Sequence, residues 1–176
     1  FLDRNTLLGD PAFVSVPVER LLSEDYAAAI RERIRAEGRI ASKHLGPGSP
    51  PHEKPETTHY SVVDAAGNAV AVTYTINGLF GAAVVAPGTG FLLNDEMDDF
   101  ALKPGTPNAF GVMGYDANAP KPGKRMLSSM TPTFLESPQK VAVLGTPGGS
   151  RIITMVLLGI LGYDAGLEPQ AVAALP

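Results

Sequence analysis

A proline- and glycine-rich segment divides this chain into two parts. Residues 39–56 cannot form regular helix or sheet, because proline or glycine interrupts them at positions 46, 47, 48, 50, 51 and 55. A strand-like segment follows at once, with Glu56 and Thr57 at the junction. A threonine becomes a capable nucleophile when its own α-amine is freed, because that amine can take the hydroxyl proton. Threonines are also common at ordinary strand starts, so the junction alone leaves both interpretations open.

One amphipathic helix is predicted before this linker. It begins at the N-cap candidate Ser23 and ends at Gly38, with apolar residues every four positions at Tyr26, Ile30 and Ile34. The chain therefore divides into an N-terminal part (1–38), the linker (39–56) and a folded domain (57–176).

The folded domain is predicted to begin as a β-hairpin. Residues 57–63 and 69–77 flank the turn 64–68, and the second strand alternates larger apolar residues with small or polar ones. This period of two places Thr75 and Asn77 on one face. Such a polar pair needs partners, which a catalytic site would supply, or it lies on a solvated outer face.

Two further segments are candidates for binding. Residues 95–99 carry four carboxylates, and a helical turn there would place Glu96 and Asp99 on one side, able to hold an ammonium group. A solvated acidic loop is the alternative. Residues 103–123 are rich in proline and glycine without periodicity, which predicts a long irregular loop of the kind that often forms a lid.

A glycine-rich turn at residues 145–150 lies between an apolar strand (141–144) and a helix that begins near Arg151. The adjacent Gly148 and Gly149 allow backbone N–H groups to point outward together, which would stabilise an oxyanion or bind a phosphate. A nucleotide-binding loop is disfavoured because its lysine and spacing are missing. A tight turn that merely requires glycine remains possible.

Composition excludes several functions. The chain has 176 residues, a net charge of -4 and no basic stripe, so no nucleic-acid partner is expected. Without cysteine there is no disulfide or thiolate metal site, and the three histidines lack metal-ligand spacing, so no metal or cofactor is expected. The longest apolar run, 152–161, is too short to span a bilayer and predicts a buried helix.

From Thr57 onward the chain resembles the small subunit of γ-glutamyltranspeptidases, which are self-cleaving N-terminal nucleophile hydrolases. The matching segments are TTHYSVVD (57–64), GNAVAVTYTIN (67–77), LLNDEMDDF (92–100), KRMLSSMTPT (124–133) and GTPGGSRII (145–153). LGDPAFVSVP (8–17) and the linker resemble the end of the large subunit. The resemblance implies an α+β fold, a four-layer αββα sandwich with the Thr57 strand central in one sheet. It also implies an inactive fragment whose small-subunit part is truncated.

The resemblance implies a mechanism. Autocleavage between Glu56 and Thr57 would free the Thr57 amine, and Thr57 Oγ would attack the γ-carbonyl of a compound such as glutathione. Thr75 would hydrogen-bond and orient the amine. The Gly148 and Gly149 amides would stabilise the oxyanion. Water or an amino acid or peptide acceptor would then release the γ-glutamyl group.

The resemblance also implies the substrate contacts. The substrate's α-amino group would be bound by Asn77, Glu96 and Asp99, and its α-carboxylate by Ser128 and Ser129. Phe110 would lie in a lid over the substrate. Position 96 is Glu where some relatives have Gln, and the family's carboxylate-binding arginine would lie upstream of Phe1.

The implied partners are the large and small subunits of one precursor, paired as a heterodimer without a membrane span, in the periplasm or outside a bacterium. Two alternatives remain. A related acylase acting on glutaryl-cephalosporin-like amides would share the nucleophile without needing the ammonium contacts of Glu96 and Asp99. An inactive remnant would fold without chemistry.

Overall fold

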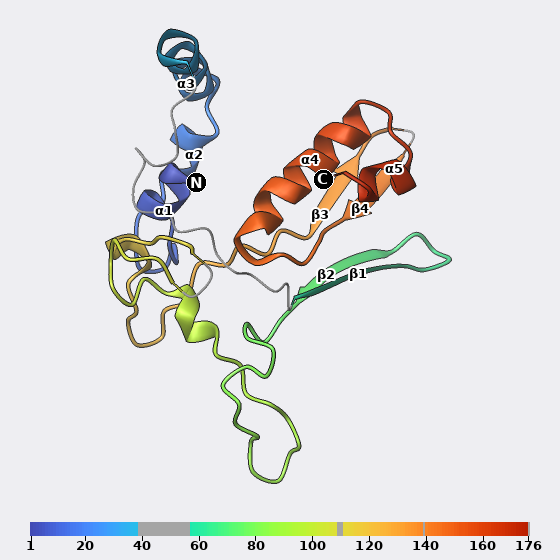
Figure 1. Ribbon diagram of the computed structural model, residues 1–176. Coiled ribbons are helices and arrows are strands. Elements are labelled where there is room, and N and C mark those ends of the chain that lie inside the picture. Colours follow the sequence, from blue (N-terminus) through green and yellow to red (C-terminus); the bar gives the residue numbers. More distant parts are fainter. Residues whose placement is uncertain (39–56, 109–110, 139, 176) are drawn as a thin grey trace. The chain divides into compact units, whose positions relative to one another are not determined.

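The computed structural model describes residues 1–38, 57–108, 111–138 and 140–175. These residues form short helices and antiparallel hairpins (Figure 1). They group into two compact units, one made of Phe1–Pro51 with Met97–Leu127 and the other of His52–Glu96 with Ser128–Pro176. Each unit therefore combines two stretches that are far apart in the sequence.

The first unit begins with three helices, α1 (Leu2–Leu7), α2 (Val18–Leu21) and α3 (Glu24–Glu37). The predicted amphipathic helix is confirmed as α3. Ser23 Oγ accepts a hydrogen bond from the third residue of the helix at 3.2 Å, and Gly38 ends the helix with a φ of 65°.

A buried carboxylate fastens this N-terminal segment to a distant part of the same unit. The side chain of Asp10 is 1% exposed and accepts hydrogen bonds from Arg125 N at 2.9 Å and from Arg125 Nη2 at 3.2 Å. It also accepts one from Ala12 N at 3.0 Å. The side-chain bonds from Arg125, followed by these backbone bonds, lower the pKa of Asp10 to about 2, because they stabilise the ionised form.

We expect Asp10→Asn to lower the melting temperature at neutral pH. The folded-state pKa is depressed, so the contribution is fully present above the ordinary Asp pKa of about 4 and is lost as the pH falls towards about 2. Thermal unfolding of the full-length protein at about pH 7, 5 and 3 measures this. The gap between wild type and variant should hold from about pH 7 to 5 and shrink by about pH 3, whereas the exposed Asp116 changed to Asn should show no such gap. A gap that persists undiminished at about pH 3 contradicts the assignment.

The second unit begins with the predicted hairpin. Strand β1 (Thr58–Val63) pairs antiparallel with β2 (Ala69–Tyr74). In the turn, Asp64 Oδ1 accepts hydrogen bonds from Ala66 N and from Asn68 N at 2.9 and 2.8 Å. The hairpin is confirmed, but its predicted extension to residue 77 is wrong. Asn77 has a φ of 71°, a left-handed conformation that turns the chain out of the strand. Thr75 and Asn77 therefore do not share a strand face.

A second antiparallel hairpin, β3 (Thr133–Glu136) and β4 (Val141–Leu144), confirms the predicted strand before the glycine turn. In the part of the chain that the structure describes, each sheet has two strands and β1 pairs only with β2. The expectation that the Thr57 strand is central in a sheet is therefore not met by these residues, because no ladder joins the two hairpins.

Helix α4 (Ile152–Asp164) follows the glycine turn, as predicted, and lies along the β3–β4 hairpin in Figure 1. Glycine favours this close approach, since a Cβ on Gly159 would lie 3.1 Å from Leu144 Cδ1, tighter than an ordinary van der Waals contact. A short helix, α5 (Pro169–Ala173), packs against α4. Among the described helices, none is long and apolar enough to cross a membrane.

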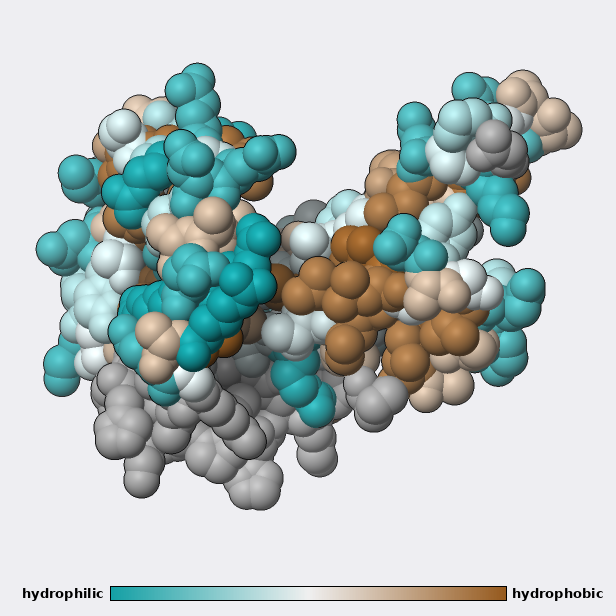
Figure 2. Space-filling model, turned by 90° about the horizontal axis from the view of Figure 1, so that it is seen from above, coloured by the Kyte–Doolittle hydropathy of each residue, from teal (hydrophilic) through white to brown (hydrophobic). Residues whose placement is uncertain are grey.

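The prediction of a buried helix at residues 152–161 is confirmed for the helix itself, but only part of its surface is buried. Ile152 and Val156 are buried, but Leu157 is 51% and Leu161 is 55% exposed, because only one face of α4 meets other described elements. Large apolar side chains are exposed elsewhere as well, including Leu22, Leu79, Phe80 and Phe91. Figure 2 shows that hydrophobic residues gather on part of the face it displays.

Candidate active site

Thr57 is half-buried and lies directly before β1. The ladder ends with the pair of Thr58 and Tyr74, so Thr57 and Thr75 are the residues directly beyond its end, one next to each strand. Thr75 Oγ1 accepts a hydrogen bond from Asn77 N at 2.9 Å. The Thr75 hydroxyl still has a proton to donate, because a hydroxyl accepts and donates at once.

The residues after β2 connect this strand end to the acidic segment. Asn77 Nδ2 donates to the carbonyl of Asp95 at 3.3 Å, and Gly78 N donates to Asp95 Oδ1 at 2.8 Å. The neighbouring Glu96 is half-buried. Burial raises the pKa of Glu96 above its ordinary value, and the charge of Asp95 raises it further.

The predicted helical turn is confirmed as the 3-10 helix η2 (Glu96–Asp99). Residues three apart lie on the same side of such a turn. The carbonyl of Asp99 accepts a hydrogen bond of 2.7 Å from Asn118 Nδ2. Asp99 belongs to the first unit, whereas Glu96 belongs to the second.

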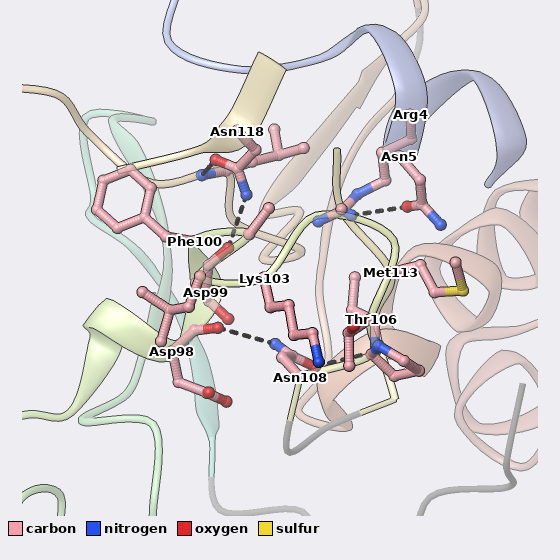
Figure 3. A pocket seen from close by; sticks show the side chains of 16 residues that line it. Arg4, Asn5, Asp98, Asp99, Phe100, Lys103, Thr106, Asn108, Met113 and Asn118 are labelled. Atoms are coloured by element: carbon pink, nitrogen blue, oxygen red, sulfur yellow. Dashed lines mark hydrogen bonds between the residues drawn. The ribbon is translucent and has the colours of Figure 1, made fainter. Parts of the chain in front are cut away.

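A pocket of about 110 Å³ lies within the first unit (Figure 3). Its polar lining includes Arg4, Asp98, Asp99, Asn108 and Asn118. Burial lowers the pKa of the Arg4 guanidinium, while the negative charge of Asp99 opposes that shift. Sequence reasoning did not single out Arg4 or Asn118. No local pattern marks them, because their roles arise from contacts with distant segments.

Ser128 and Ser129 follow the segment that Asp10 anchors. Ser128 is exposed, and its Oγ accepts a hydrogen bond from Met130 N at 3.0 Å. Ser129 is half-buried, and its carbonyl accepts from Thr131 Oγ1 at 2.9 Å. The two serines thus lie in a turn that their own neighbours hold in shape.

The glycine turn contains two consecutive residues with a positive φ. Gly148 is buried with φ 138° and ψ 19°, and Gly149 has a φ of 56°. Both values lie in the left-handed half of conformational space, which favours glycine. Among the described residues, no acceptor is found for either the Gly148 or the Gly149 amide. The turn then enters the 3-10 helix η4 (Gly149–Arg151), which continues into α4.

His59 connects the Thr57 strand to this turn. Its ring packs so closely against Gly145 that no side chain could stand at that position. His59 Nδ1 also shares a hydrogen bond of 2.9 Å with Thr73 Oγ1. Burial lowers the pKa of His59, which favours the neutral ring. The strand that starts beside Thr57 is therefore held next to the first glycine of the turn.

The second unit thus contains most of the candidate residues, whereas Asp99 lies in the first. Glu56 and Phe110 lie outside the described residues. Those in the second unit are Thr57, Thr75, Asn77, Glu96, Ser128, Ser129, Gly148 and Gly149. Among the described residues, no group of three or more His, Asp or Glu could hold a metal ion.

Comparison with known proteins identifies the family. The γ-glutamyltranspeptidase family model matches residues 1–176. A glutathione hydrolase proenzyme of Pseudomonas sp. (strain A14) is 54% identical over 178 residues, covering 100% of this chain and 31% of that protein. An acylase ACY 1 proenzyme of Pseudomonas sp. (strain SE83) is 41% identical over 162 residues, covering 92% of this chain and 27% of that protein. This chain belongs to the γ-glutamyltranspeptidase family.

A solved structure extends the likeness to the fold. The γ-glutamyltranspeptidase from Pseudomonas nitroreducens, complexed with L-DON, is 57% identical and aligns with a TM-score of 0.64. That alignment covers 68% of this chain and 63% of the other. The chain spans about a third of the length of the curated relatives it matches.

Proposed function

We propose that this chain carries the nucleophile of an enzyme that transfers and hydrolyses γ-glutamyl groups of compounds such as glutathione. The observation that supports the proposal is the β1–β2 ladder, whose last pair, Thr58 with Tyr74, brings together the two strand ends that directly adjoin Thr57 and Thr75. The glutathione hydrolase proenzyme among its relatives supports the same reaction.

The proposed chemistry begins with cleavage of the Glu56–Thr57 peptide bond, which frees the Thr57 α-amine. That amine, oriented by Thr75, takes the proton of Thr57 Oγ as the oxygen attacks the γ-carbonyl. The Gly148 and Gly149 amides donate to the resulting oxyanion, a contribution of about 3 kcal/mol per donor. The amine then returns the proton to the leaving nitrogen, which leaves a γ-glutamyl ester on Thr57. Water or an acceptor amine attacks this ester and restores the free threonine.

Substrate selectivity is assigned to groups at both ends of the glutamyl moiety. The carboxylates of Glu96 and Asp99, with Asn77, bind the α-ammonium group, because a cation is held most strongly by paired anions and hydrogen-bond acceptors. Ser128 and Ser129 bind the α-carboxylate through their hydroxyls and amides. Ser128 Oγ accepts a hydrogen bond from Met130 N, so its proton remains available for donation to a carboxylate.

Further assignments concern the lid, the fold, the subunits and the location. Phe110 is assigned to a lid over the substrate. The fold is assigned to a four-layer αββα sandwich. The chain is divided into the end of the large subunit (1–38), the linker (39–56) and the small subunit (57–176). The name proenzyme among the relatives supports a precursor that is cut into a large and a small subunit, which stay together as a heterodimer. A periplasmic or secreted bacterial location is proposed on the same likeness.

The reaction is tested with the purified full-length precursor. We expect it to release the aniline from a γ-glutamyl anilide after cleavage before Thr57. The acylase relative makes acylase activity the second candidate, and a glutaryl anilide separates the two because it lacks the α-amino group. Preference for the glutaryl substrate would favour the acylase. No cleavage and no turnover of either substrate would indicate an inactive protein.

The raised pKa of Glu96 predicts that substrate affinity falls on the acid side of the pH profile. Glu96 must be ionised to attract an ammonium group, and burial shifts its protonation to higher pH than that of an ordinary glutamate. KM for the γ-glutamyl anilide should therefore rise as the pH falls through this raised pKa. In Glu96→Gln that rise should disappear, whereas Asp99→Asn should retain it. KM measured from about pH 4 to 8 decides this, and an identical rise in wild type and Glu96→Gln would refute the assignment.

A further inference from the structure

One buried side chain connects two segments to which the proposed function assigns substrate contacts. Asn118 is 5% exposed and lies at the end of the 3-10 helix η3 (Asp116–Asn118). Its Nδ2 donates to the carbonyl of Asp99 at 2.7 Å, and its Oδ1 accepts from Leu127 N at 3.0 Å. Figure 3 shows this amide beside Asp99 at the pocket.

The backbone of Asn118 reinforces the same connection. Its carbonyl accepts a hydrogen bond of 2.9 Å from Ala101 N, two residues after Asp99. Its N–H donates to the carbonyl of Tyr115 at 2.9 Å, which fixes the turn that presents the side chain. Both polar atoms of the amide are therefore used, and each reaches a different stretch of backbone. An asparagine amide is suited to this bridge because it offers a donor and an acceptor on one rigid plane.

The segment before the serines is held at two other points. Lys124 is 7% exposed, and its Nζ donates to the carbonyls of Ala117 and Ala119 at 2.7 and 2.8 Å. Arg125 is bound to Asp10. Lys124, Arg125 and Leu127 thus each attach this segment to another part of the unit. Of the three attachments, the one at Leu127 leads to Asp99, through the side chain of Asn118. Leu127 is followed directly by Ser128.

We propose that Asn118 is a positioning residue that fixes the spacing between Asp99 and the segment leading into Ser128. The inference rests on the proposed function, in which Asp99 binds the α-ammonium group and the serines bind the α-carboxylate. These two substrate groups are attached to one carbon atom, so their protein partners must be held at a fixed separation to bind both. Loss of the bridge weakens substrate binding without altering the nucleophile at Thr57.

Two variants of the full-length precursor test the proposal. Asn118→Asp retains an acceptor for Leu127 N but places a carboxylate oxygen against the carbonyl of Asp99. Asn118→Ser is too short to reach both partners and introduces no buried charge. The matched control is Asn108→Asp, since Asn108 Nδ2 donates to the carbonyl of Asp98 at 3.2 Å and its Oδ1 accepts from Val112 N at 2.9 Å. Asn108 is thus a second asparagine whose amide joins two stretches of backbone, at Asp98 and Val112 rather than at Asp99 and Leu127.

The measurements are KM and kcat for a γ-glutamyl anilide and the rate of cleavage before Thr57. We expect KM to rise about tenfold in both Asn118 variants, because the loss of one hydrogen bond typically weakens binding by about that factor. The value of kcat and the rate of autocleavage should change by less than about threefold, and Asn108→Asp should stay within about twofold on every measure. A merely structural role would instead slow autocleavage and lower kcat together.

Four outcomes overturn the inference. They are an unchanged KM, a parallel loss of kcat and autocleavage, an equal KM rise in Asn108→Asp, and failure of both Asn118 variants to fold. Absence of turnover in the wild type is a separate result, because it removes the proposed function and the inference with it.

Discussion

Replacement of Thr57 by alanine is expected to abolish both cleavage of the Glu56–Thr57 bond and γ-glutamyl turnover. The variant lacks the hydroxyl that performs both steps, and loss of a nucleophile typically lowers kcat by about 10⁴-fold or more. Intact mass over time should show one uncleaved chain, and a γ-glutamyl anilide assay should show no release above background.

The neighbouring threonine provides the matched control for this result. Thr58 is exposed at the start of β1 and has the same side chain, so Thr58→Ala should be cleaved and active. Thr57→Ser retains a hydroxyl and should keep measurable cleavage and turnover. A Thr57→Ala protein that is still cut before residue 57, or a loss of activity confined to Thr58→Ala, would place the nucleophile elsewhere.

Gly148→Ala is expected to give the second largest loss, about 10²- to 10³-fold in kcat, as when one oxyanion donor is removed. A Cβ at this residue opposes its φ of 138° and would lie 3.3 Å from Met155 Sδ. The turn must therefore rotate, which directs the Gly148 and Gly149 amides away from the oxyanion. Steady-state kinetics should show the loss in kcat with little change in KM.

A glycine outside the site separates this effect from general backbone strain. Gly166 follows α4, has a φ of 82° and would present its Cβ to open space. Gly166→Ala should cost stability but leave kcat within about twofold. If it lowers kcat as much as Gly148→Ala does, strain rather than loss of amide donors explains the result.

The local elements were predictable from the sequence because short-range chemistry determines them. The N-cap Ser23 and the terminal Gly38 set the limits of α3, and the Asp64 turn sets the hairpin. The pairing of Thr58 with Tyr74 follows from that turn, since an antiparallel register is fixed once its loop is known. The early end of β2 was not predictable. It depends on the left-handed Asn77, whose amide bonds to Asp95 eighteen residues away.

Long-range contacts account for the other differences. Asp10 and Arg125 are 115 positions apart, so no local pattern indicates that residues 97–127 join the N-terminal segment. Similarly, Asn118 resembles any other polar residue in an irregular loop, and only its partners give it a role. The residues assigned to substrate contacts came from family resemblance rather than from periodicity, which by itself left both the acidic segment and the glycine turn open to ordinary structural explanations.

The most direct test of the central claim is the mass of the fragment that begins at Thr57, quenched rapidly after mixing the cleaved protein with a γ-glutamyl substrate. The fragment is expected to gain one γ-glutamyl acyl group, which peptide mapping should locate on Thr57. Turnover without any adduct, or an adduct on another residue, would contradict the assignment of Thr57 as the nucleophile.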